Sequence, residues 1–227
     1  MQTKHFPIVT ISIILLNGII FAAGLLSGEQ THIIQKYGFI PDQFFNAHNV
    51  ENNNDQQNSL TSLLRPSEPQ LMLSPLPNSL TRLVASMFVH ANIAHIAFNL
   101  LALAYLGVYA ERAIGVPRYL LVYLSSGIAA ALFHGAIAFY ILHNGNVVLI
   151  GASGAISGVL GIAAVTGNTR AYYWLALQIV FAVIGSISAL PIAFTAHIGG
   201  FIAGVVMTKV LVRLEKSKRK AKFFQQP

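Results

Sequence analysis

The stretch Ile150–Gly161 reads Ile-Gly-Ala-Ser-Gly-Ala-Ile-Ser-Gly-Val-Leu-Gly and contains no charged residue. Its first serine, Ser153, stands between Gly151 and Gly154, where we expect a helix to begin. A serine hydroxyl beside the free amides of a helix N-terminus suits acyl-transfer chemistry, because those amides can stabilise an oxyanion. Small residues in membrane helices more often serve close packing alone. Residues elsewhere in the chain distinguish an acyl-transfer site from close packing alone.

The composition is that of a polytopic membrane protein. Of the 227 residues, 55% are hydrophobic and 9% are charged, and the mean hydropathy is +0.63. Soluble domains usually carry about 25% charged residues. We therefore predict an all-α fold of membrane-spanning helices, whose backbone polar groups are satisfied within each helix. The chain has no cysteine, which excludes disulfides and thiol nucleophiles.

The net charge of +7 could suggest a nucleic-acid partner, but the distribution of the charges argues against one. Seven basic residues and one acid, Glu215, fall between Lys209 and Lys222, directly after a hydrophobic segment. Such a cluster is typical of a cytoplasmic flank that touches anionic lipid. The lipid bilayer is therefore an expected partner, and nucleic acid is not.

Hydrophobic segments of spanning length divide the chain. We predict six spans: Pro7–Leu26, Ile93–Ala110, Tyr119–Leu142, Ile150–Thr166, Tyr172–Leu190 and Thr195–Val212. The corresponding organisation is an N-terminus with the first helix (1–27), a long external loop (28–79), a core of five helices (80–212) and a basic cytoplasmic tail (213–227).

The distribution of Lys and Arg predicts the orientation. The side of the membrane that holds the two termini also holds most of the basic residues: Lys4, Arg112, Arg118, Arg170 and the basic tail. By the positive-inside rule that side is the cytoplasm. We thus expect an integral, multi-pass protein with both termini cytoplasmic, in the plasma or inner membrane if the source is prokaryotic.

This topology brings polar residues of three spans to one depth. The second, fourth and sixth spans run from outside to inside, so their N-terminal ends lie just below the outer surface. His95 and Asn99 lie there on the second span, Ser153 on the fourth and His197 on the sixth. Polar residues are costly inside a membrane and are usually functional. Four at one depth favour a site over four separate packing roles.

The residues in this layer suit acyl transfer. His197 is the candidate base for Ser153, since a serine needs one at neutral pH. With the Ser153 N–H, His95 and Asn99 could form an oxyanion hole. Close packing would bring the base to the serine through small residues on both helices: Gly154 and Gly158 on the fourth span, Gly200 and Gly204 on the sixth.

Other chemistries are excluded by what the spans lack. No acidic residue lies well inside any span, so we expect no carboxylate third member of a triad, and the same absence excludes a paired-aspartate protease. No His-Glu-x-x-His motif occurs, which excludes a zinc protease of that type. We expect neither a metal nor a cofactor.

Three motifs now resemble those of the rhomboid intramembrane serine proteases. They are Phe-Val-His-Ala-Asn-Ile-Ala-His-Ile-Ala-Phe-Asn (Phe88–Asn99), Gly-Ala-Ser-Gly (Gly151–Gly154) and Ala-His-Ile-Gly-Gly-Phe-Ile-Ala-Gly (Ala196–Gly204). The resemblance covers about 79–212. It implies a six-helix rhomboid bundle, a Ser153–His197 dyad, an oxyanion role for His95 and Asn99, and single-span membrane proteins as substrates, cut near the outer face. His90 matches a family position that is more structural than catalytic.

The chain departs from the family pattern in two places. The aromatic residue that the family commonly has four positions after the serine is Ser157 here, and the frequent Trp-Arg pair reads Thr81-Arg82. A non-catalytic relative that binds or escorts membrane proteins remains an alternative, although such relatives usually lack the serine or the histidine. A small transporter is a further alternative. It would predict internal repeats, which the two halves of this chain do not show.

Overall fold

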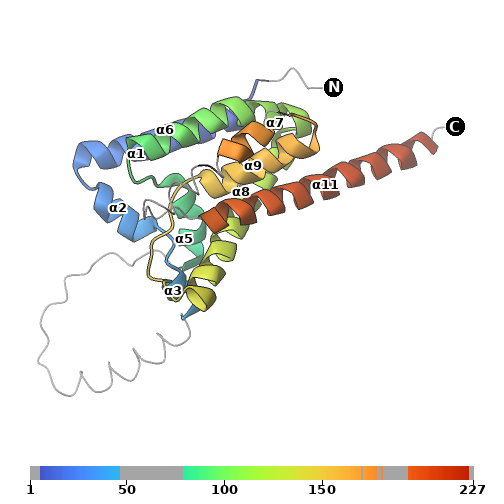
Figure 1. The fold of residues 1–227 in the computed structure, drawn as a ribbon. Coiled ribbons are helices and arrows are strands. Elements are labelled where there is room, and N and C mark those ends of the chain that lie inside the picture. The colour runs from blue at the N-terminus through green and yellow to red at the C-terminus, as the bar shows by residue number, and fades with distance from the viewer. Residues whose placement is uncertain (1–5, 47–78, 170, 178–179, 181–193, 225–227) are drawn as a thin grey trace, which may run out of the picture.

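Helices account for nearly all regular structure in the computed structural model, which describes residues 6–46, 79–169, 171–177, 180 and 194–224 (Figure 1). Within these ranges one isolated bridge is the only extended pairing, and the predicted all-α class is confirmed. The elements are α1 (Ile8–Ser27), α2 (Gln30–Tyr37), α3 (Pro41–Phe45), α5 (Ser79–Ala85), the 3-10 turn η1 (Ser86–Phe88), α6 (Ile93–Ala102), the π turn η2 (Leu103–Gly107), α7 (Val108–Ile114), α8 (Val116–Ala136), the π turn η3 (Ile137–Ile141), α9 (Ser153–Val165) and α11 (Phe194–Phe224).

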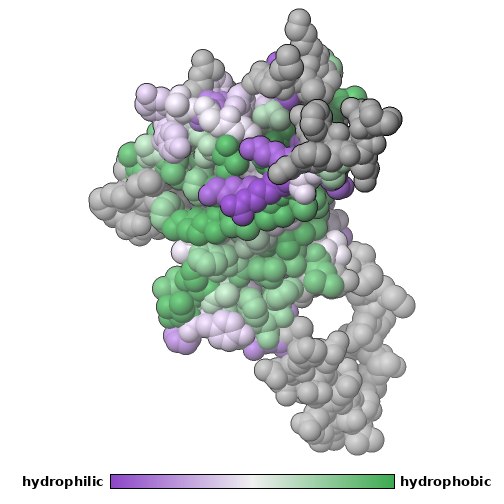
Figure 2. Space-filling view, turned by 90° about the vertical axis from the view of Figure 1, so that its right-hand side faces the viewer, coloured by the Kyte–Doolittle hydropathy of each residue, from purple (hydrophilic) through white to green (hydrophobic). Residues whose placement is uncertain are grey.

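Four continuous helices are long and apolar enough to cross a membrane. They are Ile8–Ser27, Ile93–Ile114, Val116–Ile141 and Phe194–Lys218. A shorter apolar helix, Ser153–Val165, accompanies them. Apolar residues cover much of the face that Figure 2 shows. The protein is a polytopic membrane protein, as predicted. The predicted span Tyr172–Leu190 lies largely outside the described residues.

Before α9, Leu149 exchanges two backbone hydrogen bonds with Phe39 in a short antiparallel bridge (2.9 and 2.8 Å). Helix α9 begins at Ser153, as predicted, although the apolar segment begins at Ile150. Its 13 residues extend about 20 Å, less than the roughly 30 Å of a bilayer's hydrocarbon core. At least one end of α9 must therefore lie within the membrane.

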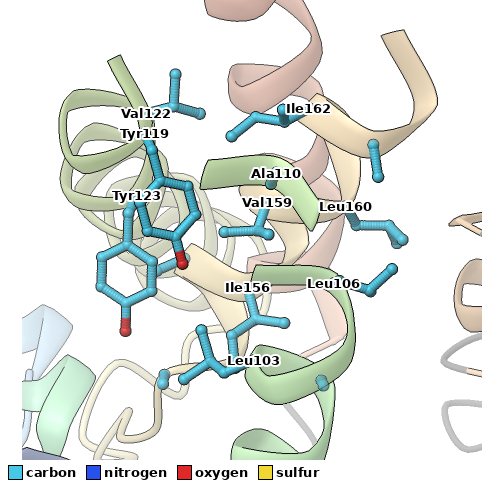
Figure 3. Close-up of a cluster of buried hydrophobic side chains, with 14 of the residues drawn as sticks. Leu103, Leu106, Ala110, Tyr119, Val122, Tyr123, Ile156, Val159, Leu160 and Ile162 are labelled. Carbon is cyan, nitrogen blue, oxygen red and sulfur yellow. The ribbon is translucent and has the colours of Figure 1, made fainter. Parts of the chain in front are cut away.

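Helix α9 occupies the centre of the bundle. Every residue from Gly154 to Ala163 is buried, which suits a helix that is apolar on all sides. Figure 3 shows side chains of α9 meeting those of α8 and of the α6–α7 helix. The labelled members of this core are Leu103, Leu106, Ala110, Tyr119, Val122, Tyr123, Ile156, Val159, Leu160 and Ile162.

Backbone contact between α9 and α11 requires glycine. A Cβ added to Gly200 would overlap the carbonyl of Gly154, and one added to Gly204 would lie 2.5 Å from the Cα of Gly158. Gly161 is equally close, since its Cβ would lie 2.7 Å from the backbone nitrogen of Val205. In lipid, helices associate through such close packing rather than through a hydrophobic driving force.

The start of α1 is fixed by a carboxylate from a distant helix. The fully buried Glu111 on α7 accepts hydrogen bonds from the N–H groups of Val9 (3.2 Å) and Thr10 (2.7 Å) and from the Thr10 hydroxyl (2.7 Å). These amides belong to the first turn of α1 and have no partner within that helix. A negative charge is also favourable at the positive end of the helix dipole.

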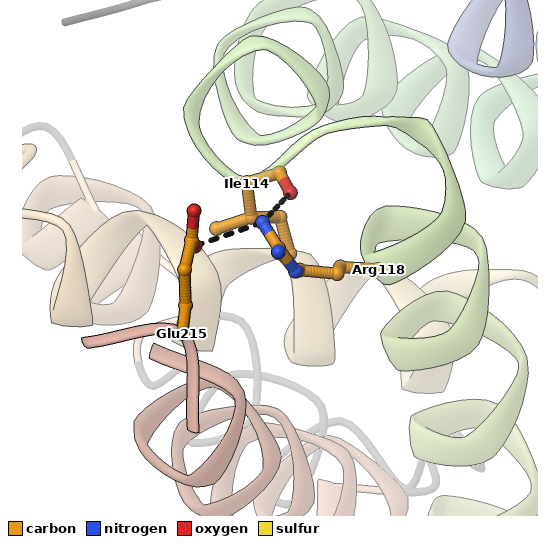
Figure 4. A network of polar contacts seen from close by, with 3 residues as sticks. All are labelled: Ile114, Arg118 and Glu215. Carbon is orange, nitrogen blue, oxygen red and sulfur yellow. Dashed lines mark hydrogen bonds and ion pairs between the residues drawn. The ribbon is translucent and has the colours of Figure 1, made fainter. Parts of the chain in front are cut away.

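Helix α11 continues through most of the basic tail. Its 31 residues extend about 46 Å, so the end of the helix projects beyond the bundle (Figure 1). Arg118 on α8 contacts this part of α11 through an ion pair with Glu215 at 2.9 Å, and it also donates to the carbonyl of Ile114 at 3.2 Å (Figure 4).

These two carboxylates give a matched pair of substitutions. We expect Glu111→Gln to lower the free energy of unfolding by about 1.5–3 kcal/mol, because charged hydrogen bonds to buried amides are lost or reversed. Glu215→Gln should cost less than about 1 kcal/mol, because its ion pair is 41% and 30% exposed. Thermal unfolding in detergent measures both, and equal losses would contradict the capping role of Glu111.

Candidate active site

Ser153 and His197 meet where α9 and α11 begin. The Oγ of Ser153 lies 2.8 Å from the Nε2 of His197, within hydrogen-bonding distance. Ser153 is the first residue of α9, and His197 lies in the first turn of α11. The two side chains come from residues 44 positions apart in the sequence. An imidazole nitrogen in this position can accept the hydroxyl proton, which is what activation of a serine requires.

A tight corner holds the residues that precede Ser153. Gly151 has φ of 110°, a backbone conformation that side chains rarely adopt, and its N–H donates to the carbonyl of Ser86 at 2.8 Å. The Phe39–Leu149 bridge holds the same segment from the other side. Phe39 and Ser86 carry no signal in the sequence pattern, because both act through backbone contacts across large sequence separations.

His95 lies against this corner. A Cβ on Gly151 would lie 2.6 Å from the Nε2 of His95, so that nitrogen faces the segment leading to Ser153. The Nδ1 of His95 accepts a long hydrogen bond from the N–H of Ala91 at 3.4 Å. A neutral ring that accepts at Nδ1 carries its proton on Nε2. The ring therefore presents an N–H donor to the corner.

Asn99 lies one turn further along α6 and is buried. Its side-chain amide donates to the carbonyl of His95 at 2.8 Å. An amide nitrogen carries two hydrogens, so this bond leaves Asn99 a second N–H. Asn92, not singled out beforehand, caps the start of α6 by accepting from the N–H of His95 at 2.9 Å. Together these bonds fix the first turns of α6.

His90 is fully buried beside His95, with the two rings 5.0 Å apart in an edge-on arrangement. Burial, and secondarily the neighbouring His95, lowers the pKa of His90 to about 4, so its ring is neutral at pH 7. Its Nε2 accepts a long bond from the N–H of Ala152 at 3.5 Å, and its carbonyl accepts from the side chain of Gln30 at 2.5 Å. His90 thus links three segments around the corner.

The surroundings of His197 differ from those of a triad histidine. Within the described part of the chain, its buried Nδ1 has no hydrogen-bond partner. Ser157, at the position where an aromatic residue is common, donates its hydroxyl to the carbonyl of Ser153 at 2.9 Å. An aromatic ring comes instead from Phe194, whose centroid is 6.5 Å from that of His197. Among the described residues, no three His, Asp or Glu side chains are grouped to hold a metal.

Comparison with known proteins identifies the class. The model of the Rhomboid domain matches residues 77–214, and the chain belongs to the rhomboid family. It is 33% identical over 153 residues to Rhomboid-type serine protease 2 of Emericella nidulans, covering 64% of this chain and 29% of that protein. It is 41% identical over 83 residues to Rhomboid protease AarA of Providencia stuartii, covering 33% of this chain and 30% of that protein.

A smaller relative is matched over more of its length. The Putative rhomboid protease YdcA of Bacillus subtilis is 30% identical over 146 residues, covering 61% of this chain and 70% of that protein. By contrast, the chain spans only about three-tenths of the length of the other two relatives. The residues matched by the family model, 77–214, include Ser153 and His197.

The corner at Gly151 can be tested by comparing it with Gly167. Both have positive φ, but a Cβ on Gly167 would meet nothing within 4 Å. Gly167→Ala should therefore lower the free energy of unfolding only by the backbone strain, about 1–2 kcal/mol. Gly151→Ala should lower the free energy of unfolding by about 1–3 kcal/mol more, because the added methyl group is also overpacked against the His95 ring.

Thermal unfolding of each variant in the wild-type and His95→Ala backgrounds measures this difference. In the absence of the His95 ring, the cost of Gly151→Ala should fall to that of Gly167→Ala. A cost that is unchanged in the His95→Ala background would mean that the ring does not press on Gly151.

Proposed function

We propose that the protein is an intramembrane serine endopeptidase that cleaves single-span membrane proteins near the outer membrane face. Ser153 is its nucleophile and His197 its general base. The observation that carries this proposal is the 2.8 Å contact between Ser153 Oγ and His197 Nε2. Support comes from membership of the rhomboid family and from relatives whose names describe them as rhomboid proteases.

In the first step, Ser153 Oγ attacks the carbonyl carbon of the scissile peptide bond while its proton passes to His197 Nε2. The tetrahedral intermediate collapses, the C–N bond breaks, and His197 returns the proton to the leaving amine. Water then attacks the acyl-enzyme while one of its protons passes to His197; the second tetrahedral intermediate collapses, the bond to Ser153 Oγ breaks, and His197 returns that proton to Oγ, leaving the other water proton on the released carboxylic acid. The reaction needs no acidic third residue, consistent with the unpartnered Nδ1 of His197 in the described structure.

The developing oxyanion needs hydrogen-bond donors. The N–H of Ser153 is one, since it lies at the N-terminus of α9, where amides lack helical partners. We assign the other two to the Nε2–H of His95, which faces the corner before Ser153, and to the second N–H of Asn99. The Ser153 N–H and His95 lie in the first turns of α9 and α6, and Asn99 lies one turn further along α6.

The location of the cut follows from the proposed topology. Lys and Arg residues favour the cytoplasm for both termini, which directs the start of α9 and α11 toward the outside. The scissile bond of a single-span protein would then enter the site from the outer half of the bilayer. The short length of α9 supports a site below the outer surface, where water can still reach the acyl-enzyme.

The dyad predicts non-additive losses. Ser153→Ala and His197→Ala should each lower the rate of cleavage of a single-span substrate by at least about 10³-fold, and the double variant should be little worse than either single variant. Purified enzyme in detergent or liposomes, with cleavage followed on gels, measures this. Full activity in Ser153→Ala, or strictly additive losses, would contradict the assignment of the dyad.

Asn99 and Asn17 provide a matched comparison for the oxyanion hole. Each buried amide donates to the carbonyl four residues before it in its own helix, at 2.8 Å. Asn99→Ala should lower kcat about 10-fold with little change in KM, because the oxyanion interaction strengthens only in the transition state. Asn17→Ala should lower the melting temperature and leave kcat near normal. Similar kcat values for the two variants would exclude Asn99 from the oxyanion hole.

A further inference from the structure

The first turn of α11 is held from two sides. Thr195 and Gly199 are one helical turn apart, and both contact α8. The hydroxyl of Thr195 lies 2.6 Å from Nδ1 of His134. A Cβ on Gly199 would lie 2.7 Å from Cβ of Phe133. His197 follows Thr195 by two residues, about 200° around the helix. It therefore faces the other way, toward Ser153 on α9.

This arrangement matters because, among the described residues, the imidazole of His197 is hydrogen-bonded only to Ser153, through Nε2. In a serine triad, a carboxylate bonded to the far ring nitrogen holds the imidazole in the productive orientation. Here the Nδ1 of His197 is buried and has no such partner in the described structure. The direction of the ring must then depend on the rotation of the helix turn that carries it.

The first turn of a helix is also its least constrained part. Its N–H groups lack partners within the helix, and helix ends open more easily than helix centres. The Gly200–Gly154 contact sets the separation of α11 from α9. The side-chain hydrogen bond from Thr195 to α8 also restricts rotation of α11 about its own axis, which contacts between glycines do not. Within a membrane it has little competition from water.

We infer that His134 and Thr195 form a positioning pair: their hydrogen bond fixes the rotation of the first turn of α11 and so holds His197 Nε2 against Ser153 Oγ. The inference rests on the proposed function, because it assigns these residues a purpose only if His197 is the base. Neither residue touches the reacting atoms. Their effect on catalysis passes entirely through the orientation of His197.

The test is Thr195→Val, which keeps the shape of the side chain and removes its hydroxyl. The matched control is Thr208→Val on the same helix, where the buried hydroxyl donates only to the carbonyl of Gly204 in its own helix, at 2.7 Å. We expect Thr195→Val to lower kcat about 10-fold with KM unchanged, since small misplacement of a catalytic group is costly. Thr208→Val should leave kcat near normal at a similar melting temperature.

Two further variants complete the experiment. Thr195→Ser retains a hydroxyl and should recover most of the lost kcat. The double variant His134→Leu/Thr195→Val should be no slower than the slower single variant, because one bond cannot be lost twice. Equal kcat for Thr195→Val and Thr208→Val, no recovery by Thr195→Ser, or additive losses in the double variant would each overturn the inference.

Ser153→Ala, measured alongside, separates this inference from the proposed function. An inactive Ser153→Ala with a fully active Thr195→Val would refute the positioning pair and leave the protease assignment intact. An active Ser153→Ala would refute the Ser153–His197 mechanism itself, and the positioning pair with it.

Discussion

The close approach of α9 and α11 is the contact on which the site depends. Where Gly204 crosses Gly158, a single added methyl group would meet backbone atoms, which cannot move aside as the end of a side chain can. Two helices in lipid gain little from hiding apolar surface, so contact this close is what holds them together. A wider separation would also move His197 away from Ser153, whose contact is now 2.8 Å.

A second constraint acts on the chain just before α9. The Leu149 bridge and the N–H of Gly151 tie this segment to two other parts of the molecule, and the positive φ of Gly151 turns the chain into the helix beside His95. Polar backbone groups cannot remain unpaired in the membrane, so the corner has to satisfy them locally. The result is a helix N-terminus whose amides lack helical partners and can stabilise a developing negative charge.

Sequence patterns predict the helices well, because apolar length and glycine spacing are local properties. The layer containing His95 and His197 followed from counting spans and charges alone. Contacts between distant residues are not predictable in the same way: the sequence places Glu111 just after an apolar segment, and its capping of α1 depends on how the two helices pack. The pairing of Leu149 with Phe39, 110 residues earlier, is likewise encoded by no local pattern.

The central claim is that the hydroxyl of Ser153 is made nucleophilic by His197. The most direct measurement is the site and rate of covalent labelling by a fluorophosphonate, mapped by mass spectrometry of the purified protein in detergent. The account predicts an adduct on Ser153 and none on the neighbouring Ser157, with labelling lost in His197→Ala while the protein remains folded. Labelling of Ser153 that proceeds equally well without His197, or a protein that cleaves substrates with its adduct on another serine, would contradict it.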